Sequence, residues 1–192
     1  LTLVLLSVWI FPDRGSLMDL AARLTRPFTE WAHPLGTDPL GRDVLARVLV
    51  GGRISLLVGF VSVLGASVLG ITVGLIAGYY RGFWDMLLMR CVDVQLALPF
   101  ILVALTFISI LGGGLGNIIL FMIVSQWVQY ARLVRGMVLS VREREFVQAA
   151  RAFGVRDFAM IRHHILPNII GPVIILMTLN VANNILLESS LT

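Results

Sequence analysis

The stretch ISLLVGFVSVLGASVLGITVGLIAGYY, residues 54–80, contains no charged side chain. A helix of about 20 apolar residues crosses the hydrocarbon core of a bilayer, so these 27 residues are enough for one span. Residues 94–131 form a second uncharged run and residues 165–187 a third. A single helix made of the second run would be about 57 Å long, so we expect two spans there.

The composition agrees with a membrane protein. Only 14% of the 192 residues are charged and 58% are hydrophobic, whereas soluble domains carry about 25% charged residues. The basic residues are all arginine, and the net charge of +4 fits cytoplasmic loops that face anionic lipid headgroups. The sequence therefore predicts an all-α, polytopic bundle of transmembrane helices.

The predicted bundle is a single domain, residues 1–192. About five spans are visible: residues 1–11 (the end of a first span), 54–80, 94–111, 117–131 (most of a fourth span) and 165–187. The glycines of residues 112–116 predict a tight turn between the third and fourth spans. The apolar start lacks a basic region and a cleavage site, so we do not expect a signal peptide. We expect a chain truncated at both ends, with a sixth span missing.

Arginine counts orient the predicted spans. Residues 132–162 hold seven arginines, which places them in the cytoplasm by the positive-inside rule. Residues 12–53 then form an extracytoplasmic loop. Within this loop Asp38 and Pro39 resemble an N-cap followed by proline at the first helical position. We expect an amphipathic helix to begin there and to lie on the membrane surface.

One face of the second span carries only small residues. Ser62, Ala66, Gly70, Gly74 and Gly78 recur every four residues. Such a face lets another helix approach closely, which is how membrane helices associate without a hydrophobic driving force. We expect these positions to pack against a neighbouring helix; the alternative is that glycine is merely tolerated in membrane helices.

The charged segment from 132 to 164 also contains apolar residues. Its pattern predicts helix up to Phe153, a break at Gly154, and helix again from Asp157 to His164. A solvated loop does not explain the apolar residues Phe146 and Val147 among so much charge. An apolar ridge on a polar loop is typical of docking into a partner's groove.

The sequence QAA at residues 148–150, followed by Gly154 and by ILP at residues 165–167, resembles the EAA loop of ABC importer permeases. Gln148 stands where glutamate is usual, and His164 where isoleucine is usual. Further stretches are similar to the peptide and nickel branch of that family: HPLGTDPLGRD at 33–43, GRISL at 52–56, AGYY at 77–80, MR at 89–90 with Asp93, Ala97 and Pro99, YARLVR at 130–135, and HILPN at 164–168. Together they cover about four-fifths of the chain.

This resemblance implies a type I ABC importer permease fold in a bacterial cytoplasmic (inner) membrane, most like the second permease of a dipeptide or oligopeptide importer. The implied partners are a second permease subunit, two ABC ATPase subunits, an extracytoplasmic substrate-binding protein and membrane lipid, with no nucleic acid. The residues it assigns to ATPase coupling are Glu145, Gln148, Ala149, Ala150, Arg151, Gly154 and Asp157. Arg135, Pro167 and Asn168 would form the hinge at the ends of the loop.

No catalytic or metal site is expected. A P-loop needs lysine to reach nucleotide phosphates, and the sequence has none. ATP and Mg²⁺ would therefore be bound by partner ATPase subunits. His33, His163 and His164 are not joined by a cluster of carboxylates or cysteines. Cys91 is expected to be a buried small residue.

Several polar positions have two interpretations. Four amides lie within the fourth and fifth predicted spans and either line the translocation path or form interhelical hydrogen bonds: Gln126, Asn180, Asn183 and Asn184. Glu188 either lines the path or is solvated at the end of a helix. Asp85, Arg90 and Asp93 are expected to anchor the third span at headgroups or to other helices. Asp38 would cap a helix or contact the binding protein.

Two other functions remain open. The same fold could import nickel, glutathione or opines, and the loop motifs do not separate these cargoes. A stand-alone secondary transporter or channel is the alternative of another class. The absence of paired charges inside the predicted spans argues against ion coupling.

Overall fold

The computed structural model describes residues 19, 22–29, 31, 33–112 and 114–191, with side chains up to residue 186. The predicted end of a first span at residues 1–11 lies outside the described residues, and so does the side chain of Glu188. The chain divides into two compact units, Leu1–Leu57 and Val58–Thr192, and each is described by itself.

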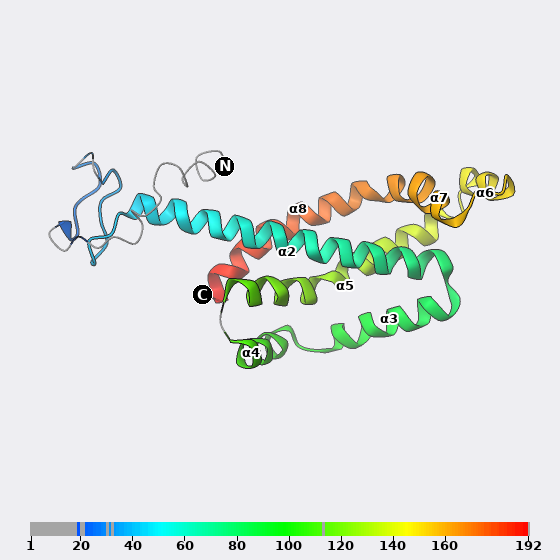
Figure 1. Cartoon of the computed structure of the whole chain (residues 1–192), viewed down its shortest axis with the longest axis horizontal. Helices are drawn as coiled ribbons and strands as arrows, with labels where there is room; N and C mark the ends of the chain where they lie inside the picture. Colours follow the sequence, from blue (N-terminus) through cyan, green and yellow to red (C-terminus); the bar gives the residue numbers. More distant parts are fainter. Residues whose placement is uncertain (1–18, 20–21, 30, 32, 113, 192) are drawn as a thin grey trace. The chain divides into compact units, whose positions relative to one another are not determined.

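The named elements of the described chain are all helices, so the predicted all-α class is confirmed. They are α2 (Val44–Tyr80), α3 (Gly82–Ala97), α4 (Phe100–Leu111), α5 (Leu115–Val141), α6 (Glu145–Ala152), α7 (Asp157–Met160), the π-helix η2 (Ile161–Ile165) and α8 (Leu166–Leu191) (Figure 1). Three helical stretches are long and apolar enough to cross a membrane, or four if α3 and α4 form one broken span.

The helix α2 begins at Val44. The Asp43 carboxylate accepts hydrogen bonds from the backbone N–H groups of Leu45 and Ala46, at 2.8 and 3.2 Å, and so caps the first turn. The predicted helix start at Asp38 is wrong. Its carboxylate instead binds the backbone N–H groups of Leu40 and Arg42, at 2.8 and 3.0 Å. Local hydrogen bonds of this kind close a turn as readily as they cap a helix.

The Asp38 carboxylate also holds two arginines of the first unit. Its Oδ2 lies 2.9 Å from Arg42 Nε and 2.6 Å from Arg47 Nη1. Desolvation raises the pKa of Asp38. Hydrogen bonds from the backbone N–H groups of Arg42 and Leu40 and from the Arg42 guanidinium outweigh this effect, and the pKa falls below its usual value to about 2. Asp38 therefore organises the loop that precedes α2.

The predicted third span is two helices rather than one. The axes of α3 and α4 meet at 90°. Leu98, between them, has an extended backbone with ψ 130°, because the ring of Pro99 disfavours helical geometry in the residue before it. The polar residues 81–93, predicted as a connecting segment, lie mostly in α3, which begins at Gly82.

The turn between α4 and α5 lies where the glycines predicted it. Leu111 ends α4 and Leu115 begins α5, and Gly112 between them has a positive φ of 76°, which costs glycine little. At its other end α5 continues past residue 131 to Val141, as the helical pattern of the charged segment predicts, because arginine is a good helix former. The predicted unbroken helix up to Phe153 is wrong: residues 142–144 form a turn between α5 and α6.

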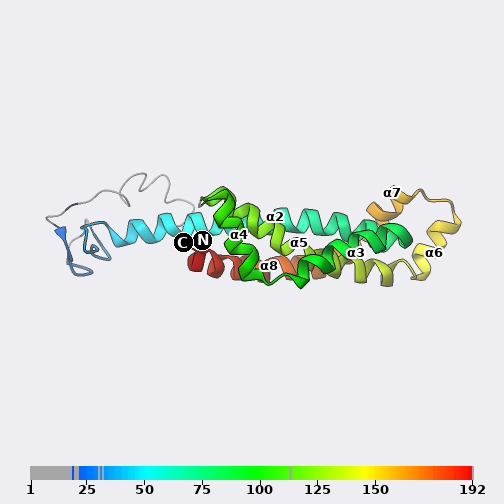
Figure 2. The same cartoon turned by 90° about the horizontal axis from the view of Figure 1, so that it is seen from below.

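Within the unit Val58–Thr192, the helices α2, α5 and α8 lie against one another (Figures 1 and 2). The predicted small face of α2 meets α5. A Cβ added at Gly70 would come 2.5 Å from the carbonyl oxygen of Trp127, and one added at Gly74 would come 2.6 Å from that of Ala131. At Gly78 it would come 2.8 Å from Val138 Cβ. Side chains at these glycines would push the two helices apart.

Two prolines shape the start of α8. Proline lacks an N–H and clashes with the carbonyl four residues earlier; for Pro167 that carbonyl belongs to His163, inside η2. A π-turn is one way in which a helix accommodates such a disruption. Asn168 Nδ2 donates to the neighbouring carbonyl of His164 at 2.7 Å, and Pro172 follows inside α8.

Candidate functional site: the hairpin of α6 and α7

The short helix α6 is amphipathic and held by one buried side chain. Val147 is fully buried against the core formed by α2, α5 and α8. The residues around it, Glu145, Gln148, Ala149 and Arg151, are exposed. Glu145 lies in the first turn and Arg151 in the last, which complements the helix dipole. Of the predicted coupling residues, Glu145, Gln148, Ala149, Ala150 and Arg151 thus lie on one surface helix, whereas Gly154 lies in the turn after it and Asp157 begins α7.

Gly154 ends α6 in a left-handed conformation, with φ 77°. The N–H of Gly154 donates to the carbonyl of Arg151 at 3.0 Å, and the N–H of Val155 donates to that of Ala150 at 3.2 Å. This pair of bonds is the Schellman motif, which favours glycine at the left-handed position. Ala150 and Val155 both pack on the core, so the turn joins α6 to α7 in a defined geometry.

Gln148 replaces the glutamate usual at this position and makes a local contact. Its Nε2 donates to the backbone carbonyl of Glu143 at 3.0 Å. A glutamate side chain carries no hydrogen to donate in its ionised form. The glutamine therefore satisfies a carbonyl in the connection between α5 and α6.

Three phenylalanines project from the hairpin, which we define as residues 145–160. Phe153 is 89% exposed and Phe158 74%, and Phe146 is partly exposed. Large apolar side chains gathered on a charged segment mark interaction sites. Figure 1 shows α6 and α7 at the same end of their unit as the last turn of α2.

The hairpin is also bound to the last turn of α2. The hydroxyl of Tyr79 donates to Asp157 Oδ1 at 2.5 Å, and the Arg151 guanidinium lies 5.8 Å from the centre of the Tyr79 ring. Arg142, which lies before the hairpin at the end of α5, donates through Nη1 to the backbone carbonyls of Gly78 and Tyr79 of the same turn, at 3.4 and 3.0 Å. Asp157, predicted as an ATPase-coupling residue, thus has a partner within its own chain.

The three hinge candidates lie in different surroundings. Arg135 binds Asp85 of α3 through two hydrogen bonds. Pro167 and Asn168 are exposed at the start of α8. Asp93 of α3 pairs with Arg132 of α5 at 2.6 Å, and both side chains are exposed. Asp85 and Asp93 therefore anchor α3 to α5.

Polar residues predicted on the fourth and fifth spans bond between α5 and α8. Gln126 Nε2 donates to Asn184 Oδ1 at 2.5 Å, and Asn180 Nδ2 donates to the Tyr130 hydroxyl at 3.0 Å. Both pairs are buried. The partners are spaced by four residues on each helix, so the two bonds form successive rungs between antiparallel helices. Asn183 is exposed.

Tyr130 and Tyr79 were not among the predicted site residues. Each is an aromatic residue at the end of an apolar stretch, which resembles an ordinary interface anchor. The spacing of Gln126 and Tyr130, matched by that of Asn180 and Asn184, was the signal available for Tyr130. Cys91, expected to be buried, is exposed in this chain.

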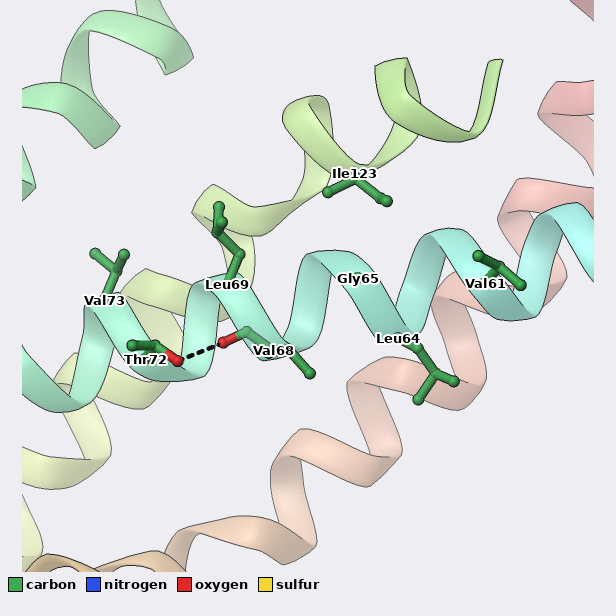
Figure 3. Close-up of a pocket in the computed structure, with 8 residues that line it drawn as sticks. All are labelled: Val61, Leu64, Gly65, Val68, Leu69, Thr72, Val73 and Ile123. Carbon is green, nitrogen blue, oxygen red and sulfur yellow. Dashed lines mark hydrogen bonds between the residues drawn. The ribbon is translucent and has the colours of Figure 1, made fainter. Parts of the chain in front are cut away.

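An aliphatic groove of about 640 Å³ runs along α2 (Figure 3). Its walls include Val61 and Val68 of α2 and Ile123 of α5. The Ile123 side chain packs directly against Gly65 of α2. The Thr72 hydroxyl donates to the Val68 carbonyl at 2.8 Å. The groove therefore offers aliphatic surface rather than groups that would hold a polar substrate.

No group of three or more histidine, cysteine, aspartate or glutamate side chains comes together among the described residues. His33 lies 3.2 Å from Asp43 Oδ2 in the first unit. His163 contacts the Ala159 carbonyl at 3.2 Å, and His164 is half-buried. The described part of the chain thus brings together helices and a surface hairpin, and the hairpin is its candidate site.

Residues 70–192 match the family of binding-protein-dependent transport system inner membrane components. The chain belongs to this family. It is a multi-pass inner-membrane protein, and the family resemblance stated from the loop motifs is confirmed. The match includes the hairpin and the glycine face of α2 from Gly70 onward.

Individual relatives of this inner membrane component are transport permeases. It is 44% identical over 169 residues to the dipeptide transport system permease protein DppC of Alkalihalophilus pseudofirmus, covering 88% of this chain and 55% of that protein. It is 43% identical to DppC of Bacillus subtilis, covering 83% and 50%, and 38% identical to the glutathione transport system permease protein GsiD of Pectobacterium atrosepticum, covering 84% and 54%. The chain spans about half the length of these relatives.

Proposed function

We propose that this inner membrane component is a permease subunit of an ATP-driven ABC importer. Paired with a second permease, it would form the translocation path for dipeptides or oligopeptides. The observation that carries the proposal is the hairpin of residues 145–160, a rigid, charged segment with exposed phenylalanines at the end of a bundle of membrane helices. The similarity to dipeptide permeases supports the cargo class.

In this proposal the chain catalyses no reaction itself. Two ATPase subunits bind ATP and Mg²⁺ and hydrolyse the nucleotide, and an extracytoplasmic binding protein delivers the substrate. The lack of lysine in the sequence supports this division, since a P-loop requires one. The exposed surface of α6, with Gln148, Ala149 and Arg151, then lies in a groove of the ATPase.

The hairpin is suited to transmitting movement. Val147 anchors α6 in the core, and the Schellman turn at Gly154 fixes the angle to α7. When ATP binding closes the ATPase subunits, the groove moves and carries the hairpin with it. The bundle then changes between inward-open and outward-open arrangements as a rigid-body rearrangement.

The polar residues of α5 and α8 divide into two groups. Gln126, Asn180 and Asn184 take part in bonds between α5 and α8, which supports the interhelical interpretation for them. Exposed Asn183 and Glu188 stay candidates for the path.

Glutathione is the second candidate cargo, because the GsiD relatives are 36–38% identical to this chain. Glutathione is itself a small peptide, so both cargoes require a path for the same chemical groups. Uptake of radiolabelled dipeptides and of glutathione by cells that express the full-length transporter separates the two. Nickel and opines belong in the same uptake panel as controls.

Co-purification tests the proposal against a stand-alone transporter. The full-length protein, expressed with its genomic neighbours, should be extracted as a stable complex with a subunit that carries Walker motifs. Liposomes containing that complex should import peptide only when ATP is present on the side of the membrane where the ATPase subunits lie. Transport by the purified permease alone, without ATP, would contradict the proposal.

A further inference from the structure

The last turn of α2 is held by the hairpin and by Arg142, the residue that follows α5, as well as by α5 itself. Three residues beyond α5 contact it: Arg142 through the carbonyls of Gly78 and Tyr79, Arg151 over the Tyr79 ring, and Asp157 through the Tyr79 hydroxyl. The Tyr79 side chain is only 5% exposed. Every one of these contacts joins residues more than sixty positions apart in the sequence.

The chemistry of these contacts makes the connection directional and stiff. A hydroxyl that donates to a carboxylate forms a charge-assisted hydrogen bond, which is shorter and stronger than a neutral one. The Arg142 guanidinium meets the carbonyl end of α2, where the helix dipole favours positive charge. Gly78, in the same turn, lies directly on Val138, so this turn cannot shift without moving α5.

We propose that Tyr79 is a positioning residue through which the hairpin moves α2, so that α2, and not only α5 and α8, carries motion from the ATPase into the bundle. The inference rests on the proposed function, and it adds a third route of transmission. The two ends of the hairpin continue into α5 and α8 through the chain itself. The direct route from the hairpin to α2 runs through the contacts at Tyr79.

The neighbouring tyrosine provides a matched control. Tyr80 is 53% exposed, and its ring meets that of Tyr79 edge-on at 5.2 Å. No hydrogen bond of its hydroxyl is found in the described part of the chain. Removing the hydroxyl from Tyr79 or from Tyr80 is the same chemical change at adjacent positions, one inside the contact network and one outside it.

The experiment uses the full-length transporter with its second permease, its ATPases and its binding protein, reconstituted in liposomes. The measured quantity is the number of peptides imported per ATP hydrolysed. Tyr79→Phe keeps the ring and its contact with Arg151 but removes the donor to Asp157. We expect it to assemble normally and to lower this ratio about tenfold, because a hydrogen bond to a charged group contributes more than a neutral one. Tyr80→Phe should leave the ratio unchanged.

A second variant keeps the test decisive if Tyr79→Phe assembles poorly. Asp157→Ala removes the acceptor from the other side, and the double variant should be no worse than the worse single one, because both remove the same bond. A ratio equal to wild type in assembled Tyr79→Phe or Asp157→Ala transporter overturns the inference. So does an equal loss in Tyr80→Phe, or additive losses in the double variant.

The outcome also separates this inference from the proposed function. If the wild-type transporter imports peptide without ATP, the proposed function fails, whatever the variants do. If wild-type import depends on ATP and Tyr79→Phe behaves as wild type, only the role of Tyr79 fails. A merely structural role for Tyr79 would lower assembly and leave the peptide-to-ATP ratio of the assembled fraction intact.

Discussion

The guanidinium of Arg135 on α5 donates two hydrogen bonds to the carboxylate of Asp85 on α3, Nε to Oδ1 at 2.5 Å and Nη2 to Oδ2 at 2.7 Å. Both side chains are partly buried. The planar guanidinium matches the carboxylate in a way that a lysine ammonium does not. This pair fixes the first half of the broken span against the helix that leads into the hairpin.

Arg135→Lys should therefore lower the free energy of unfolding by about 1 kcal/mol, since the partial exposure weakens the pair. For a domain of this size that corresponds to about 3 °C in the melting temperature of the detergent-solubilised protein. Arg132→Lys is the control, because both side chains of the pair between Arg132 and Asp93 are more than half exposed. Equal shifts in both variants would contradict a special role for Arg135.

Gly74→Ala should destabilise the bundle, because its Cβ would come 2.6 Å from the carbonyl oxygen of Ala131 and 2.8 Å from Val134 Cβ. Overpacking of this kind costs about 2 kcal/mol. The same substitution at Gly136, where no atom lies within 4 Å of the added carbon, should be neutral or stabilise α5 by up to about 1 kcal/mol. Thermal unfolding of both variants measures the difference; similar melting temperatures would mean that α2 and α5 are not in close contact.

The hydrogen bond between Gln126 and Asn184 predicts that substitutions of these two residues are not additive. Asn184→Leu leaves the Gln126 amide buried without its acceptor, which should cost about 1–2 kcal/mol. Replacing both residues with leucine should cost less than the sum of the two single changes. A double-variant cycle on melting temperature measures this, and strict additivity would show that the two amides do not interact in the membrane.

Acid should loosen the loop that precedes α2. Because the pKa of Asp38 is lowered to about 2, its contribution to stability is fully present above the unfolded value near 3.8 and is lost as the pH falls toward 2. Pepsin acts over this range, so cleavage after loop residues should be slow at pH 4 and fast at pH 2. In Asp38→Asn the ion pairs with Arg42 and Arg47 are gone at both pH values. Its loop should be cut at pH 4 faster than that of wild type; equal rates there would remove Asp38 from this role.

Much of this architecture follows from hydropathy and glycine placement alone. The uncharged runs predict the membrane helices, and Gly112 and Gly154 mark turns because each adopts a positive φ. The sequence does not predict which of Asp38 and Asp43 caps α2. Either residue can close a turn or cap a helix, and only tertiary packing decides between them. Pro99 signals a break, but its 90° angle depends on what α3 and α4 pack against.

The contacts at the candidate site are the least predictable part. Tyr79 and Asp157 are 78 positions apart, and no local pattern links them. The coupling role of residues 145–157 rests on resemblance and on exposure, while the structure adds that Val147 and Asp157 hold the hairpin to the bundle. Local sequence determines the helix and its glycine turn, and long-range packing determines what the hairpin can move.

The most direct test of the central claim is ATP-dependent peptide uptake by liposomes that contain the full-length transporter with a bulky side chain on the exposed face of the hairpin. Ala149 is exposed on α6, and tryptophan there would obstruct the proposed ATPase groove. We predict that Ala149→Trp inserts in the membrane at the wild-type level but loses uptake by at least tenfold. Wild-type uptake by this variant would contradict the coupling role of the hairpin.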